Sequence, residues 1–253
     1  MKISIITPTF NSSNTISSCI ESISLQTHND IEHIIIDGGS NDGTIDIINE
    51  YQRNNSRFFV KYISEKDNGI YDALNKGIVI SSGEVIGILH SDDLFAGNLA
   101  LSKIVKVFSS DSSIEGCYGD LCYVSASDTG KVIRYWKAGE YKLKSFVYGW
   151  MPPHPTCFFR KCVYEKYGGF DTSYEISGDY ELILRFLYKN RINMFYLPEV
   201  ITLMRFGGRS NGSIKNILSK MREDAEIMKK YGLPFYFSLP LKSLRKIHQF
   251  FTK

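Results

Sequence analysis

Residues 84–93 read EVIGILHSDD, and this stretch decides the fold that the sequence predicts. Its apolar run, 84–89, is typical of a strand buried on both faces of a sheet. Two adjacent carboxylates, Asp92 and Asp93, follow the strand. Because neighbouring carboxylates repel each other, we expect a positive partner, and Mg²⁺ or Mn²⁺ suits carboxylate and phosphate oxygens. The alternative is that the pair only caps the helix that follows.

Strands and helices alternate through residues 1–110. Apolar runs predict strands at 2–7, 33–37, 58–63 and 84–89, and helical spacing predicts helices through Ile16, Ile20 and Ile23 and at 44–51, 70–80 and 98–108. This alternation predicts an α/β fold with a parallel, doubly wound sheet. Ligands of such sheets bind where the strands end. Those ends carry Thr7-Pro8, Asp37, residues 65–68 and Asp92-Asp93.

The second half of the chain is less regular. Its patterns predict strands at 116–124, 132–135, 156–159 and 194–203 (the last broken at Pro198) and helices before Gly168-Gly169 and at 180–188, 214–231 and 239–251. No repeat or linker marks two independent domains. A chain of 253 residues, 43% of them hydrophobic, can bury one large core.

Composition excludes several classes of protein. A net charge of +3 is too small to indicate nucleic-acid binding. Five cysteines without paired C-x-x-C spacing argue against a structural zinc site and a disulfide framework. The sequence shows neither a signal peptide nor a run of about 20 apolar residues that could span a bilayer. We therefore expect a cytoplasmic protein with reduced thiols.

The C-terminal segment is basic. No acidic residue follows Glu226, whereas Lys229, Lys230, Lys242, Arg245, Lys246 and Lys253 do. An amphipathic basic helix can lie in a membrane interface, so the pattern predicts peripheral contact with the cytoplasmic face of the inner membrane. The alternative is a helix that packs its apolar side on the domain.

Three more polar segments can carry chemistry. Asp37 follows an apolar strand and begins DGGSNDGT, where the glycines allow close approach of a nucleotide to the backbone. Asp67 can cap the next helix, and Lys76 near its end is favourable there without any ligand. Asp179 starts an apolar-sided helix, either as its N-cap or as a base that takes a proton from an acceptor hydroxyl.

Four of these segments, in order, resemble the family 2 inverting glycosyltransferases of the GT-A fold. They are IITPTFN at 5–11, DGGSNDGT at 37–44, DNGIYDALNKG at 67–77 and SDD at 91–93. The resemblance implies a GT-A type, mostly parallel sheet flanked by helices in a domain spanning 1–232. Its nucleotide-binding half would be 1–110, its acceptor-binding half 111–232, and residues 233–253 would form a helical, basic extension.

The resemblance also implies roles for single residues. Thr7 and Pro8 would line the base pocket, Asp37 would contact the base, and Asp92 would contact the ribose or a metal-bound water. Asp67 and Lys76 would belong to the donor site. Asp93 would ligate Mn²⁺ or Mg²⁺, and His154 would reach the metal or the diphosphate, unless it is only a histidine of the cleft wall. Asp179 would be the catalytic base.

The later part of the chain resembles bacterial surface-polysaccharide transferases, such as those of O-antigen (lipopolysaccharide), capsule or exopolysaccharide. The matching segments are 154–171, Gly178-Asp179 and the loop 207–210. Gly178 departs from the family, which usually has Glu or Ser there, so only Asp179 is carried over. The Gln-x-x-Arg-Trp motif of processive enzymes is absent. Its absence favours transfer of one sugar over polymerisation. The resemblance implies a UDP-hexose or UDP-N-acetylhexosamine as the donor, with dTDP and GDP left open as the nucleotide, and a lipid-diphosphate-linked saccharide as the acceptor.

Two other classes of protein fit parts of the pattern. A sugar-1-phosphate nucleotidyltransferase usually needs a glycine-rich basic loop after the first strand, where this chain has TPTFNSS. A non-catalytic nucleotide-sugar-binding module is disfavoured by the intact carboxylates at 37, 92, 93 and 179. Nothing in the sequence indicates an oligomeric state.

Overall fold

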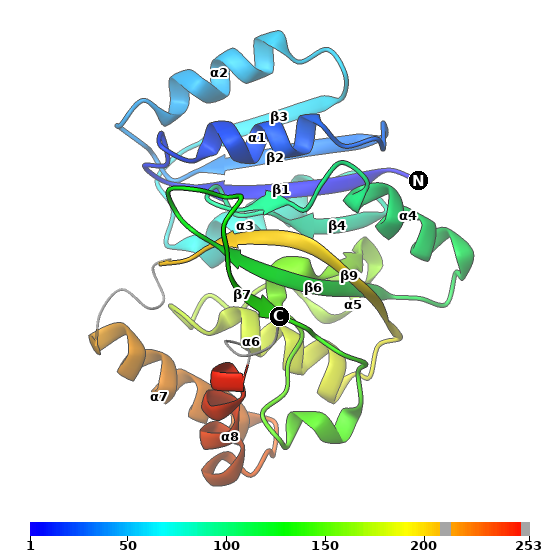
Figure 1. Ribbon diagram of the computed structural model, residues 1–253, viewed down its shortest axis with the longest axis vertical. Coiled ribbons are helices and arrows are strands. Elements are labelled where there is room, and N and C mark those ends of the chain that lie inside the picture. The colour runs from blue at the N-terminus through cyan, green and yellow to red at the C-terminus, as the bar shows by residue number, and fades with distance from the viewer. Residues whose placement is uncertain (208–213, 249–253) are drawn as a thin grey trace.

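The computed structural model describes residues 1–207 and 214–248. Its sheet has the strand order β3-β2-β1-β4-β8-β6-β9-β5, with β7 paired to β6 (Figure 1). The strands are β1 Ile3–Thr9, β2 Ile31–Asp37, β3 Phe59–Ser64, β4 Val85–Ile88, β5 Leu94–Phe95, β6 Gly116–Val124, β7 Val132–Trp136, β8 Phe158–Arg160 and β9 Met194–Arg205. The helices are α1 Ile16–Ser24, α2 Thr44–Asn54, α3 Ile70–Ile80, α4 Ala100–Ser110, α5 Lys161–Tyr167, α6 Gly178–Ile183, α7 Ile214–Lys230 and α8 Phe235–His248, with the short helices Leu143–Phe146, His154–Thr156 and Leu184–Lys189.

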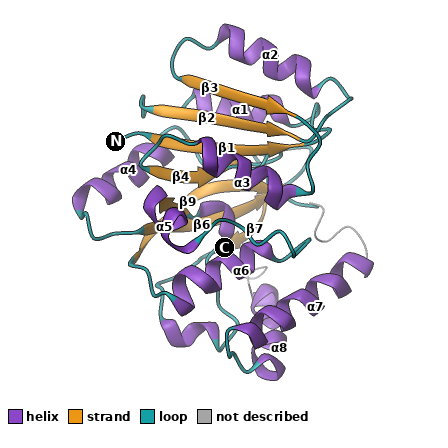
Figure 2. Ribbon diagram, turned by 180° about the vertical axis from the view of Figure 1, so that it is seen from behind, coloured by secondary structure: helices purple, strands orange, loops and turns teal. Residues whose placement is uncertain are grey.

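Strands β1 to β4 form the parallel half of the sheet. β1 pairs in parallel with β2 and β4, and β2 pairs in parallel with β3. Every residue of β1 and β2 is buried, because helices cover both faces. Helices α1 and α4 pack on one face and α3 on the other, as the two opposite views show (Figure 1, Figure 2). Since parallel strands end at one edge, the loops after β1, β2 and β4 come together there.

The other half of the sheet is mixed. β8 is antiparallel to β4 and β6, and β6 is antiparallel to β7 but parallel to β9. The predicted α/β fold is therefore confirmed, with parallel pairing dominant only in the first half. The predicted break at Pro198 is wrong, because β9 continues through it. The pairing register with β6 shifts between Tyr196 and Val200 instead, so a bulge accommodates the missing proline N–H.

Some predicted boundaries also move. The strand expected at 156–159 is β8, which follows a short 3₁₀ helix. The helix expected at 180–188 starts at Gly178 and continues as a π-helix after Ile183. The last helix begins at Phe235, not at residue 239, because the carbonyl of Pro234 accepts the first N–H groups of the helix. Its predicted end at 251 lies outside the described residues.

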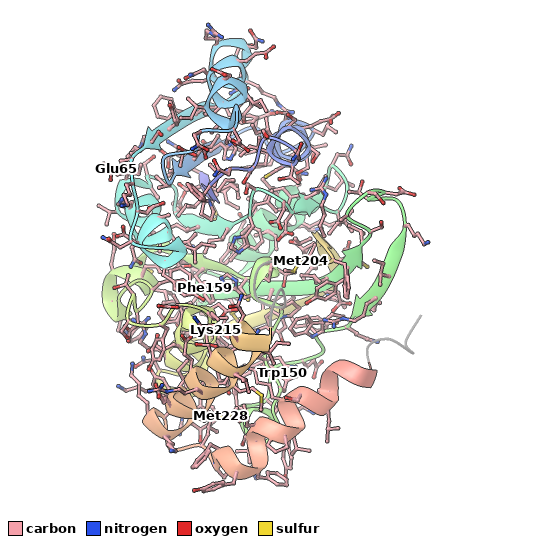
Figure 3. The ribbon with its side chains drawn as sticks, turned by 90° about the vertical axis from the view of Figure 1, so that its left-hand side faces the viewer. Glu65, Trp150, Phe159, Met204, Lys215 and Met228 are labelled. Carbon is pink, nitrogen blue, oxygen red and sulfur yellow. The ribbon has the colours of Figure 1, made fainter. Side chains whose placement is uncertain are left out.

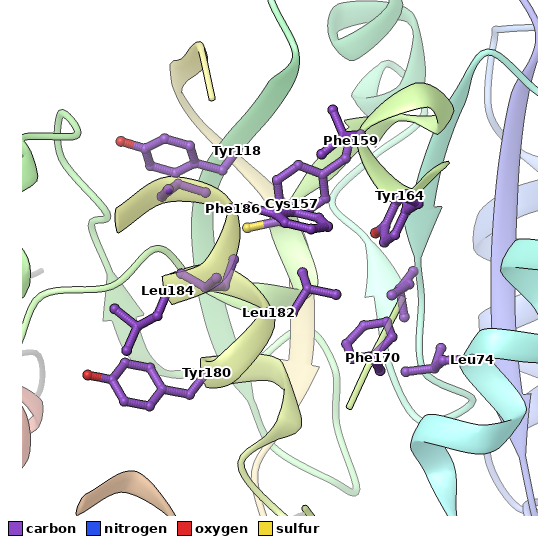
Figure 4. Packing of buried hydrophobic residues seen from close by; sticks show 14 of the residues in the cluster. Leu74, Tyr118, Cys157, Phe159, Tyr164, Phe170, Tyr180, Leu182, Leu184 and Phe186 are labelled. Atoms are coloured by element: carbon purple, nitrogen blue, oxygen red, sulfur yellow. The ribbon is translucent and has the colours of Figure 1, made fainter. Parts of the chain in front are cut away.

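A large aromatic and aliphatic core supports α6. Phe186 meets Phe159 edge to face at 5.1 Å between ring centres and Tyr164 at 5.5 Å (Figure 4). Leu182 is fully buried in the same cluster. Such aromatic pairs add about 0.5–1.5 kcal/mol each beyond their burial. The first turn of α6, which carries Asp179, is therefore built on a rigid base.

Helices α7 and α8 lie at the end of the molecule away from β3 (Figure 1, with Lys215 and Met228 of α7 labelled in Figure 3). Lys242 on α8 places its ammonium group 2.8 Å from Asp224 Oδ2 and 3.2 Å from the centre of the Tyr180 ring. A methyl group on Gly149 would lie 2.3 Å from the backbone nitrogen of Lys242. The described part of the predicted extension thus packs closely on the domain. Its exposed side carries Tyr236, Phe237 and Leu244, and residues 249–253 lie outside the described chain.

Glu32 on β2 makes the stability of the parallel half depend on pH. Its buried carboxylate accepts hydrogen bonds from Ser4 and Ser82 and lies 2.8 Å from Lys61 Nζ. Burial alone would raise the pKa of Glu32, but these partners lower it to about 2 from an ordinary value of 4.5. A lowered carboxyl pKa stabilises the fold above the ordinary pKa, and this contribution is lost as the pH falls through the folded value.

We expect Glu32→Gln to lower the free energy of unfolding by about 2–3 kcal/mol at neutral pH. This deficit should shrink as the pH falls from 4.5 towards about 2, because the wild type loses the same contribution. Urea unfolding of both proteins across that range measures it. A deficit that is independent of pH would contradict the assignment.

Candidate active site

The loop after β2 is organised by the predicted base contact, Asp37. Its Oδ2 atom accepts hydrogen bonds from the N–H groups of Gly39 and Ser40 and from the Ser64 hydroxyl, at 2.6–3.0 Å. Its Oδ1 atom accepts the Ser40 hydroxyl. The carboxylate is fully buried. In this structure it therefore shapes the loop that begins at Gly38 and is not itself exposed to a ligand.

Thr7 and Pro8 are buried within β1. The Thr7 hydroxyl lies 3.0 Å from His33 Nε2, between β1 and β2, so this side chain belongs to the core and not to an open pocket. The exposed aromatic at this strand end is Phe10, 59% exposed, which sequence analysis did not single out. A methyl group on Gly38 would lie 3.4 Å from the Phe10 ring, so the loop after β2 runs beside it.

Asp67 also lies close to Gly38. A methyl group on that glycine would be 3.0 Å from Asp67 Oδ2, and the Oδ1 atom is buried with no hydrogen-bond partner. Lys76 Nζ lies 3.8 Å from Asp67 Oδ1, but closer to Glu65 (2.8 Å) and Asp72 (3.4 Å). Burial raises the pKa of Asp67, although Lys76 opposes this. The structure thus brings Asp67 and Lys76 together beside the loop after β2.

The SDD segment lies at the end of β4. The hydroxyl of Ser91 is 2.9 Å from that of Ser12, and the backbone oxygen of Asp92 accepts a hydrogen bond from Arg205 of β9. Asp93 is fully buried, and neither of its carboxylate oxygens has a hydrogen-bond partner. Burial, and then the charge of Asp92, raise the pKa of Asp93 well above its ordinary value. A buried carboxylate without a partner is unfavourable unless a cation neutralises it.

These carboxylates fit the predicted Mn²⁺ or Mg²⁺. Such ions bind one or two carboxylates and complete their coordination with water and substrate phosphates. The protein itself therefore need not supply every ligand of the ion. Within residues 1–207 and 214–248, no three His, Cys, Asp or Glu side chains lie close enough together to bind a metal ion on their own. Asp93 supplies the unpartnered oxygens, with Asp92 beside it.

A cavity of about 810 Å³ lies next to the SDD segment, and its wall includes His90, His154 and Asp179. The rings of His90 and His154 are 6.0 Å apart, so His154 does reach the region where β4 ends. Burial lowers the pKa of His154 to about 4, which keeps its imidazole neutral at physiological pH. A neutral imidazole can bind a metal or accept a proton.

Asp179 lies in the first turn of α6 and accepts a hydrogen bond from the N–H of Tyr180. Burial alone would raise the pKa of Asp179, but His154, in the protonated form that it takes only at acidic pH, and the charges of Lys220 and Lys242 lower it below its ordinary value. The carboxylate is therefore charged at neutral pH and can accept a proton inside the cavity.

Gly178 departs from the family pattern for a steric reason. A methyl group there would lie 2.7–2.9 Å from three ring carbons of Tyr71. The Tyr71 hydroxyl donates to the Ile176 carbonyl, so the ring cannot move away freely. Only glycine fits between Tyr71 of α3 and the start of α6.

Several cavity residues were not predicted. Arg134 and Trp136 of β7 line the cavity, and the Arg134 guanidinium lies 3.9 Å from the centre of the Tyr123 ring. Lys220 and Lys242 come from α7 and α8. The sequence offered one signal for Arg134 and Trp136, because residues 132, 134 and 136 of a strand lie on the same face. Spacing shows which residues lie together but not what they face.

The half-parallel, mixed sheet flanked by helices is a GT-A-like α/β fold, which glycosyltransferases of known structure share. Residues 4–167 match Glycosyl transferase family 2, and the chain belongs to this family. The predicted family and its glycosyltransferase class are therefore confirmed. This membership favours glycosyl transfer over the nucleotidyltransferase alternative.

Relatives agree with this assignment. An uncharacterized glycosyltransferase of Mycobacterium tuberculosis is 31% identical over 188 residues, which are 72% of this chain and 68% of the relative. A PGL/p-HBAD biosynthesis glycosyltransferase of Mycobacterium bovis is 27% identical over 209 residues, or 82% of this chain and 78% of the relative.

Solved structures share the fold. S. aureus TarS 1–349 in complex with UDP has a TM-score of 0.68 at 18% identity, with 94% of this chain and 68% of that one covered. This chain spans only 41% of a longer TarS chain. The mannosyltransferase PcManGT from Pyrobaculum calidifontis, in complex with GDP-Man and Mn²⁺, has a TM-score of 0.66 at 16% identity, with 96% and 73% covered.

Proposed function

We propose that this chain transfers one sugar, with inversion, from a UDP-hexose or UDP-N-acetylhexosamine to a hydroxyl group of a saccharide acceptor. The observation that carries the proposal is the buried, unpartnered Asp93 beside a cavity whose wall holds the charged Asp179. Two TarS structures contain UDP or UDP-GlcNAc, and the PcManGT structure contains GDP-Man with Mn²⁺. These donors support a nucleotide-diphosphate sugar here.

On the donor side, the loop that Asp37 shapes would receive the nucleotide base, with Phe10 and Asp67 beside it. Thr7 and Pro8 would support this pocket from within β1, and Asp92 would approach the ribose. Lys76 would contribute by holding Asp67 in place. Asp93, with His154 nearby, would hold Mn²⁺ or Mg²⁺, which when bound neutralises charge on the diphosphate leaving group.

On the acceptor side, Asp179 would take the proton from the attacking hydroxyl. The hydroxyl oxygen then forms a bond to the anomeric carbon on the face opposite the diphosphate. The bond to the diphosphate oxygen breaks, and its electron pair leaves with the nucleoside diphosphate. The lowered pKa of Asp179 supports this role, because the carboxylate is unprotonated before the acceptor arrives.

The acceptor is proposed to be a lipid-diphosphate-linked saccharide of a surface polysaccharide, reached at the cytoplasmic face of the inner membrane. No helix within the described residues is long and apolar enough to cross a bilayer. The exposed Tyr236, Phe237 and Leu244 of α8 support peripheral contact. The non-catalytic binding module remains the alternative function.

Proton NMR of donor hydrolysis tests the proposal. Purified protein with Mn²⁺ is incubated with α-linked UDP-glucose, UDP-galactose or UDP-N-acetylglucosamine, and the first anomer of the released sugar is recorded before mutarotation. We expect the β-anomer first. The α-anomer first would exclude inversion, and no hydrolysis of any donor would favour the binding module.

A further inference from the structure

The segment that leads into α6, residues 175–177, is held by a side chain from another helix. Glu223 of α7 accepts hydrogen bonds from the backbone N–H groups of Glu175 (3.1 Å), Ile176 (3.0 Å) and Ser177 (2.7 Å). N–H groups at the start of a helix have no partner within it, and a carboxylate there also complements the helix dipole. Ser177 is the N-cap residue of α6, and Glu175 and Ile176 precede the helix, so Glu223 caps the segment that leads into α6.

The local sequence provides no substitute for this cap. Ser177 is in the N-cap position, but it makes no capping hydrogen bond, and its buried hydroxyl has no partner. The segment 175–177 is also fixed from its other side, where the Tyr71 hydroxyl of α3 donates to the Ile176 carbonyl at 2.7 Å. It is thus held between α3 and α7, two residues before Asp179.

One face of α7 is directed at this region. Residues 220, 223 and 224 are three and four positions apart, so they lie on the same side of the helix. Lys220 lines the cavity, Glu223 binds the segment 175–177, and Asp224 pairs with Lys242 of α8. This face of α7 therefore contributes one residue to the cavity wall and contacts two other parts of that wall.

We propose that Glu223 is a positioning residue, which sets the place and direction of the Asp179 carboxylate through the segment 175–177. This inference rests on the proposed role of Asp179 as the base. Hydrogen bonds to a carboxylate are about twice as strong as neutral ones, so three of them hold a short segment firmly. Catalysis is sensitive to displacements of about 1 Å, which the loss of this cap would allow.

The test compares Glu223→Ala and Glu223→Gln with Glu226→Gln. Glu226 is on the same helix, but its side chain is 51% exposed and its partner Arg222 is 83% exposed. The Glu226→Gln variant therefore controls for the loss of one negative charge from α7. Amide hydrogen exchange of residues 175–177 reports the contact directly. Steady-state hydrolysis of the UDP-sugar reports kcat and KM separately.

In Glu223→Ala we expect the amides of 175–177 to exchange at least about tenfold faster, because they lose their acceptor. We expect kcat to fall about 10- to 100-fold while the donor KM changes by less than about twofold, because the donor side is untouched. Glu223→Gln keeps one acceptor oxygen and should be intermediate, which preserves the test if the alanine variant is unstable. Glu226→Gln should behave as the wild type.

Two outcomes would overturn the inference. Unchanged exchange at 175–177 would show that the contact does not hold the segment. Faster exchange with an unchanged kcat would show that Glu223 holds residues 175–177 but that this contact does not affect the reaction. The variant Asp179→Asn distinguishes a failure of the Glu223 inference from a failure of the proposed function. If Asp179→Asn hydrolyses the UDP-sugar as fast as the wild type, Asp179 is not the base, and this result does not depend on Glu223.

Discussion

Asp179→Asn is expected to lower turnover of the nucleotide sugar by about 10²- to 10⁴-fold, the usual contribution of a positioned general base. An amide cannot take the acceptor proton, whereas the carboxylate is charged at neutral pH because its pKa lies below the ordinary value. At this pH Lys220 and Lys242 oppose the effect of burial, while the imidazole of His154 is neutral. The Asp179 side chain lies in the cavity wall and not in the loop after β2. The affinity for the nucleoside diphosphate should therefore stay within about twofold.

Asp171→Asn is the matched control for this variant. Asp171 precedes α6 in the same region of the chain, but its carboxylate is 32% exposed and binds Ser173 and Lys230. We expect its turnover to stay within about twofold of the wild type, because Asp171 is partly exposed and does not line the cavity. The assignment of the base is contradicted if Asp179→Asn keeps wild-type turnover in the same assay.

Asp93→Asn should have two opposite effects. Metal-dependent turnover should fall by at least about 10²-fold, because the unpartnered oxygens that fit the cation are lost. Without divalent cations, however, the variant should be more stable by about 1–3 kcal/mol, because a buried, unpaired charge is removed. The direction of this change in stability follows from the raised pKa of Asp93. A carboxyl group whose pKa is higher in the folded state than in the unfolded state destabilises the folded state at neutral pH.

Asp120→Asn is the control for the effect on stability. Asp120 is also buried, but it accepts hydrogen bonds from Tyr135, Ala138 and Tyr196. Its replacement should lower stability by about 1–3 kcal/mol, since donors lose a charged acceptor. Thermal unfolding in EDTA measures both variants. A loss of stability in Asp93→Asn similar to that in Asp120→Asn would argue against an uncompensated charge at Asp93.

The parallel half of the fold was predictable because its signals are local. Apolar runs and helical spacing locate β1 to β4 and α1 to α4, and parallel pairing then brings the loops around Asp37 and Asp93 to one edge. The burial of Thr7 could also have been inferred. It lies on the same face of β1 as Ile3 and Ile5, which pack under α1 and α4.

The acceptor side was less predictable because it depends on contacts between distant segments. The mixed pairing of β8 and β9 joins strands from separate parts of the chain, which no local pattern specifies. The contact of Glu223 with residues 175–177 spans almost 50 positions of sequence. Helical spacing on α7 indicates that residues 220, 223 and 224 share a face, but tertiary packing alone decides what that face meets.

Thermal shift with nucleoside diphosphates tests the central claim most directly. The Tm is measured with UDP, GDP, CDP or dTDP, with and without Mn²⁺, for the wild type and for Asp93→Asn. A ligand that binds the folded state stabilises it by about 2.7 kcal/mol at a hundred times its Kd. We predict a rise in Tm with UDP that requires Mn²⁺ and disappears in Asp93→Asn. No rise with any of the four diphosphates would contradict the proposal that this chain binds a nucleotide-sugar donor at Asp93.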